Sequence, residues 1–288
     1  AETLIKQNNC GANVYYRLSN NTLTIFGKGV MKNCFTKTTA NMNIGNAVRV
    51  RSYQKYISKV VNIVVENGVS KIGNGAFACM PKLKTAKIQG NLGIAALWGC
   101  TNLEKVTYTN GKGTMGFACF GNCKKLRNMV IAEAVSSMNR SCFAGCISLE
   151  KITVDSKNKK YASENGMLFN KDRTLLFCYP AGMQGVEVII KTGVKTIAKN
   201  AFFDNKNIQR IKFPKTVTKV EDEAVINCSN LEKVTFCGNK PNDLGKFVLG
   251  KDDVVIWYSN KYKNSWSNYN LYKKQEYIEP RRTCIGMP

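Results

Sequence analysis

The chain has 288 residues, 44% of them hydrophobic, and its 43 Lys and Arg against 19 Asp and Glu give a formal net charge of +24. This length allows a sizeable core, and the absence of an apolar run of about 18 residues predicts no membrane-spanning helix. Histidine is absent, which excludes His-based acid–base catalysis, His-dependent nucleophiles and His-containing zinc sites. No basic segment followed by an apolar run opens the sequence, so we expect no signal peptide in it.

The first predicted element is a β-hairpin near the N-terminus. Apolar stretches over residues 14–18 and 23–26 are separated by Asn20 and Asn21, a pair that favours a tight hairpin turn. We expect residues 1–56 to form an N-terminal β cap on the structure that follows.

A degenerate phrase then recurs along the chain. Its leading small residue appears at steps of 20, 23, 23, 59 and 23 residues, at Ala76, Ala96, Cys119, Cys142, Ala201 and Ala224. An apolar residue seven places later keeps the same spacing, at Leu83, Leu103, Leu126, Leu149, Ile208 and Leu231. A fixed period of this size is typical of a solenoid, and we assign residues 57–258 to it.

Each copy predicts the same local structure. Alternating apolar residues, such as Val234 and Phe236 around Thr235, indicate a half-buried strand. A second apolar pair, such as Val217 with Val220, indicates another extended piece, and a tight turn follows it. We therefore expect coils of about 23 residues with two short strands and one helical turn. A lone coil cannot bury its apolar residues, so stability should be roughly a sum of terms between neighbouring coils.

The step of 59 residues equals 23 plus 36, so about 36 residues are inserted after Val154. Within this insertion, assigned to residues 155–190, we expect a β-hairpin. Residues 254–258 form the last predicted strand, and Tyr262 and Trp266 suit one face of a closing helix in a C-terminal cap and tail over residues 259–288. No low-complexity linker interrupts the sequence, so we expect one elongated unit rather than two domains.

Twelve cysteines are present, and half of them follow the repeat. One slot holds Cys100, Cys123, Cys146 and Cys228, and the small-residue slot holds Cys119 and Cys142. Buried thiols behave as small hydrophobic side chains with a weak S–H donor, so we interpret these six as packing residues rather than metal ligands. We expect no bound metal and no cofactor. Cys10 with Cys34 is the one pair for which we would test a disulfide.

The residues between the inward-facing apolar positions of the first strand should face solvent. The candidate ligand-binding residues are the basic and hydroxyl side chains at these positions: Lys87, Lys105, Thr107, Lys151, Thr153, Arg210, Lys212, Lys233 and Thr235. Coils stacked about 4.8 Å apart would align them into a stripe on one sheet, which would attract a polyanion. The alternative is a lysine-rich face that serves only solubility, with glutamates at 104, 150 and 232 partly compensating.

The repeat resembles that of the BspA-like leucine-rich-repeat family of bacterial surface and secreted proteins. The repeat has the form V-x-x-I-x-x-x-A-F-x-x-C-x-x-L-x-x-I-x-[IVF], which is followed by residues 217–236 and, with slips, by residues 69–88. The coil after Ile88 is three residues short. The segments 10–31 and 165–182 also resemble parts of such proteins. The resemblance implies a β-rich leucine-rich-repeat solenoid of the right-handed α/β horseshoe type. It also implies a non-catalytic exported protein that binds host or neighbouring-cell ligands.

We therefore expect a non-enzymatic extracellular binding or adhesion module, secreted or held at the cell surface. It would act as a monomer and recognise an acidic glycan, such as a glycosaminoglycan, or a matrix protein through its basic sheet face. Two alternatives stay open, a lyase acting on acidic polysaccharide and a non-specific nucleic-acid binder. The scattered acids disfavour the first, and the absence of a recognised nucleic-acid-binding module disfavours the second.

Overall fold

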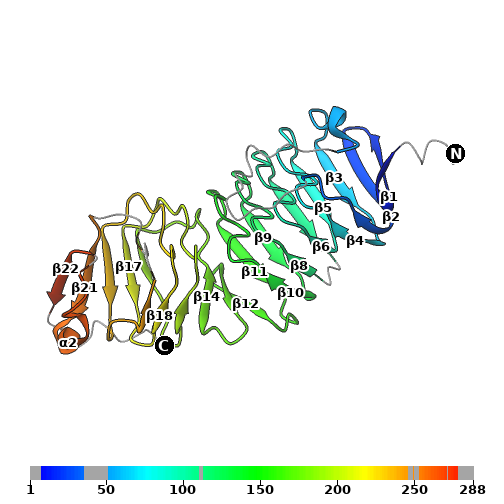
Figure 1. Cartoon of the computed structure of the whole chain (residues 1–288). Coiled ribbons are helices and arrows are strands. Elements are labelled where there is room, and N and C mark those ends of the chain that lie inside the picture. The colour runs from blue at the N-terminus through cyan, green and yellow to red at the C-terminus, as the bar shows by residue number, and fades with distance from the viewer. Residues whose placement is uncertain are drawn as a thin grey trace. The chain divides into compact units, whose positions relative to one another are not determined.

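The computed structural model describes residues 8–35, 51–109, 113–245, 249, 253–270 and 272–277. The chain divides into two compact units, Ala1–Lys160 and Tyr161–Pro288, which run from blue to green and from green to red in Figure 1. We expected one elongated unit, because the sequence shows no linker at this boundary. The boundary lies inside the segment 155–190 that the sequence assigns to an insertion. The finer division into caps and solenoid at residues 56 and 258 stays a prediction.

The first unit begins with an antiparallel hairpin of β1 (Asn9–Ser19) and β2 (Thr22–Met31), where the sequence predicts one. Asn20 and Asn21 form its turn with φ angles of 46° and 60°, a left-handed conformation that asparagine tolerates. The first half of β2 pairs with one sheet of the solenoid and its second half pairs with the other. The hairpin therefore starts both sheets.

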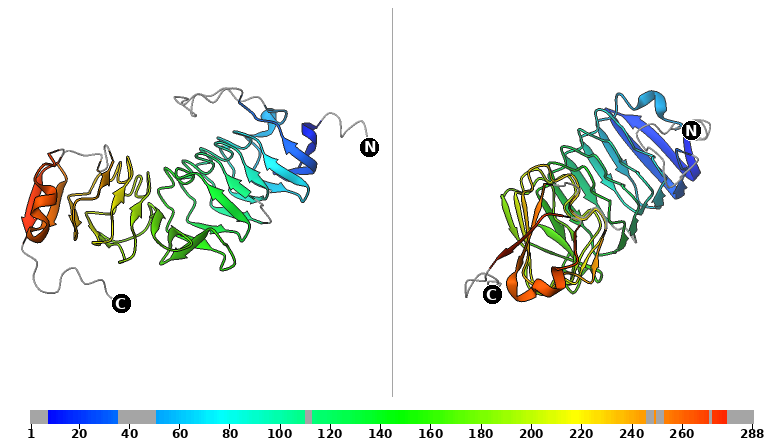
Figure 2. Two further views of the ribbon diagram at one scale, coloured as in Figure 1. Left: turned by 60° about the horizontal axis from the view of Figure 1, so that its bottom comes forward. Right: turned by 60° about the vertical axis from the view of Figure 1, so that its left-hand side comes forward.

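Each coil of the first unit contributes two short strands. The front strands are β3 (Asn62–Val65), β5 (Thr85–Ile88), β7 (Lys105–Tyr108), β9 (Asn128–Ile131) and β11 (Lys151–Val154). The back strands are β4 (Val69–Ile72), β6 (Asn91–Leu92), β8 (Gly113–Met115) and β10 (Val135–Met138). Their pairings are parallel, and they appear as successive rungs in both views of Figure 2. A 3₁₀ helix, η2 (Gln54–Tyr56), precedes β3.

The second unit opens with an antiparallel meander of β12 (Tyr161–Glu164), β13 (Met167–Asn170) and β14 (Leu175–Cys178). The predicted inserted hairpin corresponds to β13 and β14, and β12 adds a third strand. β14 pairs in parallel with the first of the further back strands, β16 (Thr196–Ile197), β18 (Lys219–Val220) and β20 (Asp243–Leu244). The front strands are β15 (Glu187–Ile189), β17 (Arg210–Phe213), β19 (Lys233–Phe236), β21 (Val255–Ser259) and β22 (Lys274–Tyr277).

The C-terminal end differs from the prediction in one strand. A short helical segment, η3 (Asn260–Tyr262) and α2 (Lys263–Trp266), follows β21, with Trp266 buried and Tyr262 half-buried. β22 then pairs in parallel with β21, so β21 is not the last strand as we expected. The sequence of β22 is Lys-Gln-Glu-Tyr, which lacks the apolar alternation by which the other strands were predicted. Residues 278–288 of the predicted tail lie outside the described residues.

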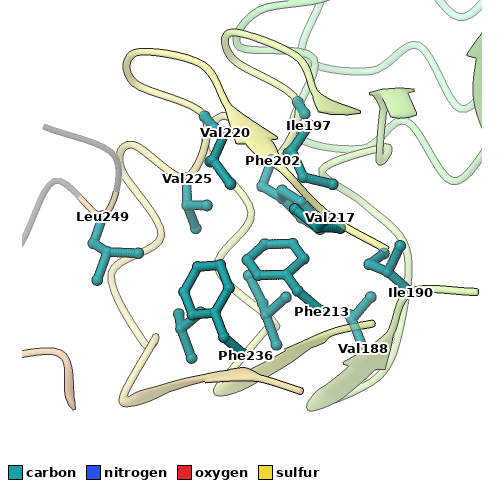
Figure 3. Packing of buried hydrophobic residues seen from close by; sticks show 14 of the residues in the cluster. Val188, Ile190, Ile197, Phe202, Phe213, Val217, Val220, Val225, Phe236 and Leu249 are labelled. Carbon is teal, nitrogen blue, oxygen red and sulfur yellow. The ribbon is translucent and has the colours of Figure 1, made fainter. Parts of the chain in front are cut away.

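Within each unit the core lies between the front and back strands. Parallel register places like residues on top of one another, so Phe213 of β17 stacks against Phe236 of β19 with ring centroids 5.2 Å apart. Both rings point into the cluster drawn in Figure 3. Trp266 is fully buried and extends this aromatic row, with its ring centroid 5.0 Å from that of Phe236. Burial of such large apolar groups is the main favourable contribution to the stability of the stack.

The turn that carries the small residue is not the helical turn that we expected. Gly75 and Cys79 have φ angles of 63° and 55°, a left-handed conformation foreign to the α-helix. The N–H groups of Gly75, Phe77 and Cys79 donate to carbonyl oxygens of the next coil at 2.9, 2.8 and 2.7 Å. The N–H group of Ala76 instead donates within the turn, to the carbonyl of Gly73 at 3.2 Å. A helix would direct its N–H groups along its own axis and leave the neighbouring coil without these bonds.

The cysteine slot serves the same stacking. The Sγ atoms of Cys100 and Cys228 lie 3.0 Å from a backbone carbonyl oxygen of the preceding coil, and that of Cys146 lies 3.1 Å from its counterpart. Asn205 occupies the slot in another coil and donates from Nδ2 to the carbonyl of Pro180 at 3.3 Å. The slot therefore requires a compact donor. Burial raises the pKa of Cys100 and of Cys228 to about 12, so both thiols keep the proton that they donate.

The shortened coil after Ile88 is closed by Gly90, whose φ angle is 75°. A Cβ atom at this position would lie 2.6 Å from the carbonyl oxygen of Ser70, so only glycine fits. The hydroxyl of Tyr108 donates to the Gly90 carbonyl at 2.6 Å and holds the turn. The three-residue deletion is therefore accommodated by one tight turn.

Leu149 occupies the apolar slot of the fourth copy and is 1% exposed. Leu149→Ala leaves a cavity between neighbouring coils, so we expect the free energy of unfolding in denaturant to fall by about 2–5 kcal/mol. Ile147→Ala is the matched control because Ile147 is 42% exposed in the same coil, and it should cost less than about 0.5 kcal/mol. Equal losses for the two variants would contradict the stacking account.

Cys228→Asn tests the donor slot. Because asparagine makes the same bond at position 205, we expect the free energy of unfolding at neutral pH to change by less than about 1 kcal/mol. Cys228→Ala removes the donor to the carbonyl of Phe202, and it should cost about 1–3 kcal/mol.

The Cys228→Asn variant also tests whether stability depends on pH in the alkaline range. The pKa of the Cys228 thiol is 9.0 when unperturbed and about 12 in the folded chain, so between these values the unfolded state binds fewer protons. The contribution of the buried thiol to the free energy of unfolding is complete below pH 9. It is lost toward pH 12, by about 1.4 kcal/mol per pH unit. Denaturant unfolding above pH 9 should show a shallower decline for Cys228→Asn than for the unmodified chain. Identical declines would contradict this role of the buried thiol.

Candidate binding surface

The candidate residues of the first unit lie on the solvent side of the front strands. In β7, Lys105 and Thr107 are exposed while Val106 between them is buried. Lys87 of β5 pairs in register with Thr107, and Thr85 pairs with Lys105. Two rows of side chains therefore cross the coils, with Lys105 in one row and Lys87 in the other.

Strand β9 interrupts the predicted stripe. Its outward residues, Asn128 and Val130, lie in register with Lys151 and Thr153 of β11, and Val130 is 52% exposed. We expected the candidate residues to align into a basic and hydroxyl stripe. The face of the first unit is instead a mixed surface in which an amide and an apolar side chain lie beside Lys151 and Thr153.

The lysines of this face are separate charges. Among the described residues, Lys87, Lys105 and Lys151 form no ion pair. The nearby glutamate at 150 pairs with Arg127 at 2.7 Å. Exposed charges of this kind attract an anionic partner, and the attraction weakens as salt is added.

The second unit brings its candidate residues closer together. Arg210 of β17 is in register with Lys233 of β19, and Lys212 is in register with Thr235. All four side chains are half-buried. We call these four residues the second-unit face. Adjacent strands lie about 4.8 Å apart, so this face combines three cations and a hydroxyl within a small area.

The electrostatics of the second-unit face indicate a true cluster. Burial lowers the pKa of Lys233, Arg210 and Lys212 lower it further, and Glu187 opposes them. Glu187 also pairs with Arg210, with Oε1 3.5 Å from Nε. The two neighbouring cations thus disfavour the charged form of Lys233, and an anion bound at the face would offset their effect.

Sequence reasoning missed Trp257 as part of this surface. Trp257 lies beside Thr235 in register, and the Nζ of Lys233 lies 3.6 Å from the centroid of its indole ring, a close cation–π contact. We expected residues 254–258 to form only a closing strand, although period-two alternation places Trp257 outward between buried Ile256 and Tyr258. On the other side the face is bordered by Ile189, which is 62% exposed.

Two cysteines of the repeat, Cys119 and Cys123, are poor nucleophiles. Burial raises the pKa of Cys119 and Cys123 well above the usual thiol value, so neither provides thiolate at neutral pH. Cys10 and Cys34 are both thiols, and burial raises the pKa of each. Among the described residues, no three Cys, Asp or Glu side chains lie close enough to hold a metal ion. In the same residues, no helix is long and apolar enough to cross a membrane.

The chain is similar to known proteins over most of its length. A family model described as a BspA type leucine rich repeat region, with six copies, matches residues 8–95, 50–171 and 181–249. No functionally curated protein matches significantly.

Two solved structures share the fold. A leucine-rich repeat protein from Eubacterium ventriosum is 22% identical, with 88% of this chain and 78% of that chain covered and a TM-score of 0.60. The pneumococcal vaccine antigen PcpA is 14% identical, with 94% of this chain and 98% of that chain covered and a TM-score of 0.54. At these identities the similarity concerns the fold alone. The family model matches most of the length of the chain, so the chain belongs to the BspA-type leucine-rich-repeat family.

Proposed function

We propose that this protein is a non-enzymatic extracellular binding module, secreted or held at the cell surface, that adheres to an acidic glycan. The observation that carries the proposal is the second-unit face, where Arg210 and Lys212 lie close enough to lower the pKa of Lys233 on one solvent side of a sheet. Membership of a family of bacterial leucine-rich-repeat proteins is consistent with a binding role.

The chemistry of the face suits sulfate and carboxylate groups. Ammonium and guanidinium groups form charge-assisted hydrogen bonds with such oxyanions, and the hydroxyl of Thr235 offers a further donor beside Lys212. An extended polyanion releases counterions when it binds a basic surface, which gives affinity together with strong salt dependence. The net charge of +24 adds long-range attraction.

An acidic glycan is favoured over nucleic acid by the placement of the aromatic residue. Single-stranded nucleic acids are held by aromatic rings on which bases stack. At the second-unit face the Lys233 ammonium lies over the ring of Trp257, so this ring is occupied by a cation. The mixed face of the first unit, with Lys87, Lys105 and Lys151, would provide a second and weaker area of contact.

The test compares two variants that lose the same charge. Lys212→Gln with Lys233→Gln removes cations from the second-unit face. Lys195→Gln with Lys206→Gln removes two exposed lysines elsewhere in the same unit. We expect the first pair to elute from immobilised heparin at clearly lower salt and to reduce the slope of log K against log salt by about 1–2. The control pair should change elution much less.

Equal losses in the two variants would mean that only net charge matters and would overturn the proposed site. Retention on single-stranded DNA that exceeds retention on heparin, and that falls with the same variant, would transfer the site to nucleic acid. Thermal unfolding of both variants establishes that they are folded.

The clustering of the cations is tested by the titration of Lys233 itself. Arg210→Gln removes a like charge and releases Glu187 from its ion pair, and both changes favour the charged form of Lys233. We therefore expect the pKa of Lys233, followed by NMR at its side-chain nitrogen, to rise. Lys206→Gln is the control and should leave this pKa unchanged. An unchanged pKa in Arg210→Gln would show that these residues do not act as a cluster.

A further inference from the structure

A small pocket lies in the second unit, away from the second-unit face. It is formed by the segments that follow β17 and β19, together with the helical segment at the C-terminal end, and has a volume of about 260 Å³. The polar side chains that line it are Lys215, Thr218, Asn239, Lys240, Asn242 and Tyr262. None of them belongs to the candidate residues on the sheet.

The lining combines two cations with neutral hydrogen-bonding groups and contains no carboxylate. The neighbouring acid, Asp243 of β20, forms an ion pair with Lys219 of β18, with Oδ2 2.8 Å from Nζ. Lys215 is exposed and forms no ion pair with any described residue. The pocket therefore carries a local positive charge that no described acid of its own lining balances.

Several of its polar groups have no partner within the described part of the chain. The side chains of Thr218, Asn239 and Asn242 form no hydrogen bond with other described residues. Lys240 donates from Nζ to the carbonyl of Pro241 at 3.1 Å, which leaves two of its three N–H groups for a ligand. These donors and acceptors are available to the hydroxyl and carboxylate groups of a bound molecule.

The wall of the pocket is held in place by a close backbone approach and by two hydrogen bonds to side chains of the C-terminal helical segment. A Cβ atom at Gly238 would lie 2.8 Å from the Cα atom of Lys215, so glycine allows the two segments to approach. The carbonyl of Gly238 accepts from Nε1 of buried Trp266 at 3.4 Å. The backbone N–H of Lys240 donates to the hydroxyl of Ser265 at 3.0 Å. The pocket is thus preformed by the C-terminal cap, and preformed sites avoid the entropic cost of ordering on binding.

We infer that this pocket binds a single carboxylated sugar residue, of the uronic acid type. Its volume is below the roughly 300–1,000 Å³ of sites for drug-sized ligands, which suits one sugar ring. Lys215 and Lys240 would hold the carboxylate, and the two amides and Thr218 would bond the ring hydroxyls. The inference shares the ligand class of the proposed function, but it uses different side chains, so the two fail separately.

The experiment titrates the complete chain with D-glucuronate, and with D-glucose and acetate as probes of the ring alone and of the charge alone. By NMR we expect D-glucuronate to bind with a Kd on the order of 1 mM and to shift the amide signals of Asn239 and Asn242, and the two probes to bind about tenfold more weakly. Lys215→Gln with Lys240→Gln should weaken D-glucuronate at least about tenfold.

The controls separate this site from the sheet. Lys206→Gln, and Lys212→Gln with Lys233→Gln, should each leave D-glucuronate binding within about twofold. The exposed Asn242→Ala provides a milder variant, expected to weaken binding a few-fold while thermal unfolding is unchanged. Acetate that binds as tightly as D-glucuronate would reduce the pocket to an anion site and overturn the inference. So would an absence of D-glucuronate binding, or equal losses in the pocket and control variants.

Discussion

Hydrogen bonding between the backbones of successive coils is the constraint on which the rest of this structure depends. The front and back strands form parallel ladders, and at the turn the N–H groups of Gly75, Phe77 and Cys79 also reach the next coil. Buried backbone groups must be paired, so no coil is complete without its neighbours. The β1–β2 hairpin meets this requirement at the start of the first unit by pairing with both sheets. In the second unit, β22 covers the edge of β21.

Stacking also decides what each side chain in a repeated slot has to do. A cysteine in the slot of Cys228 donates to a carbonyl of the coil before it, and Asn205 does the same with an amide. Burial keeps the Cys228 thiol protonated, so a residue that suggests redox or metal chemistry in isolation acts as a packing and hydrogen-bonding group. Phe213 and Phe236 follow the same logic, because register places like residues together, and Trp266 of α2 packs against Phe236.

Because inward positions are committed to the stack, recognition is left to the outward residues and to the irregular ends. On the sheet of the second unit, register concentrates Arg210, Lys212 and Lys233, whereas Asn128 and Val130 dilute the corresponding rows of the first unit. The pocket beside Tyr262 has a different origin, since it is formed where the last coils meet the C-terminal helical segment. A flat cationic surface suits a polymer, and a pocket suits one of its units, so the two sites would contact an acidic glycan in different ways.

The sequence by itself determined the period, the two strands of each coil, the N-terminal hairpin and the packing role of the cysteines. These features depend on local apolar alternation and on the comparison of copies, both of which are visible in one dimension. Only the tertiary structure decided that the turn is left-handed at Gly75 and Cys79, that β22 follows β21, and that Lys233 lies against Trp257. The first two carry no apolar pattern, and the third joins residues that are distant in sequence and meet only through parallel register. Contacts between coils create the proposed binding surfaces, which become defined only when the coils stack.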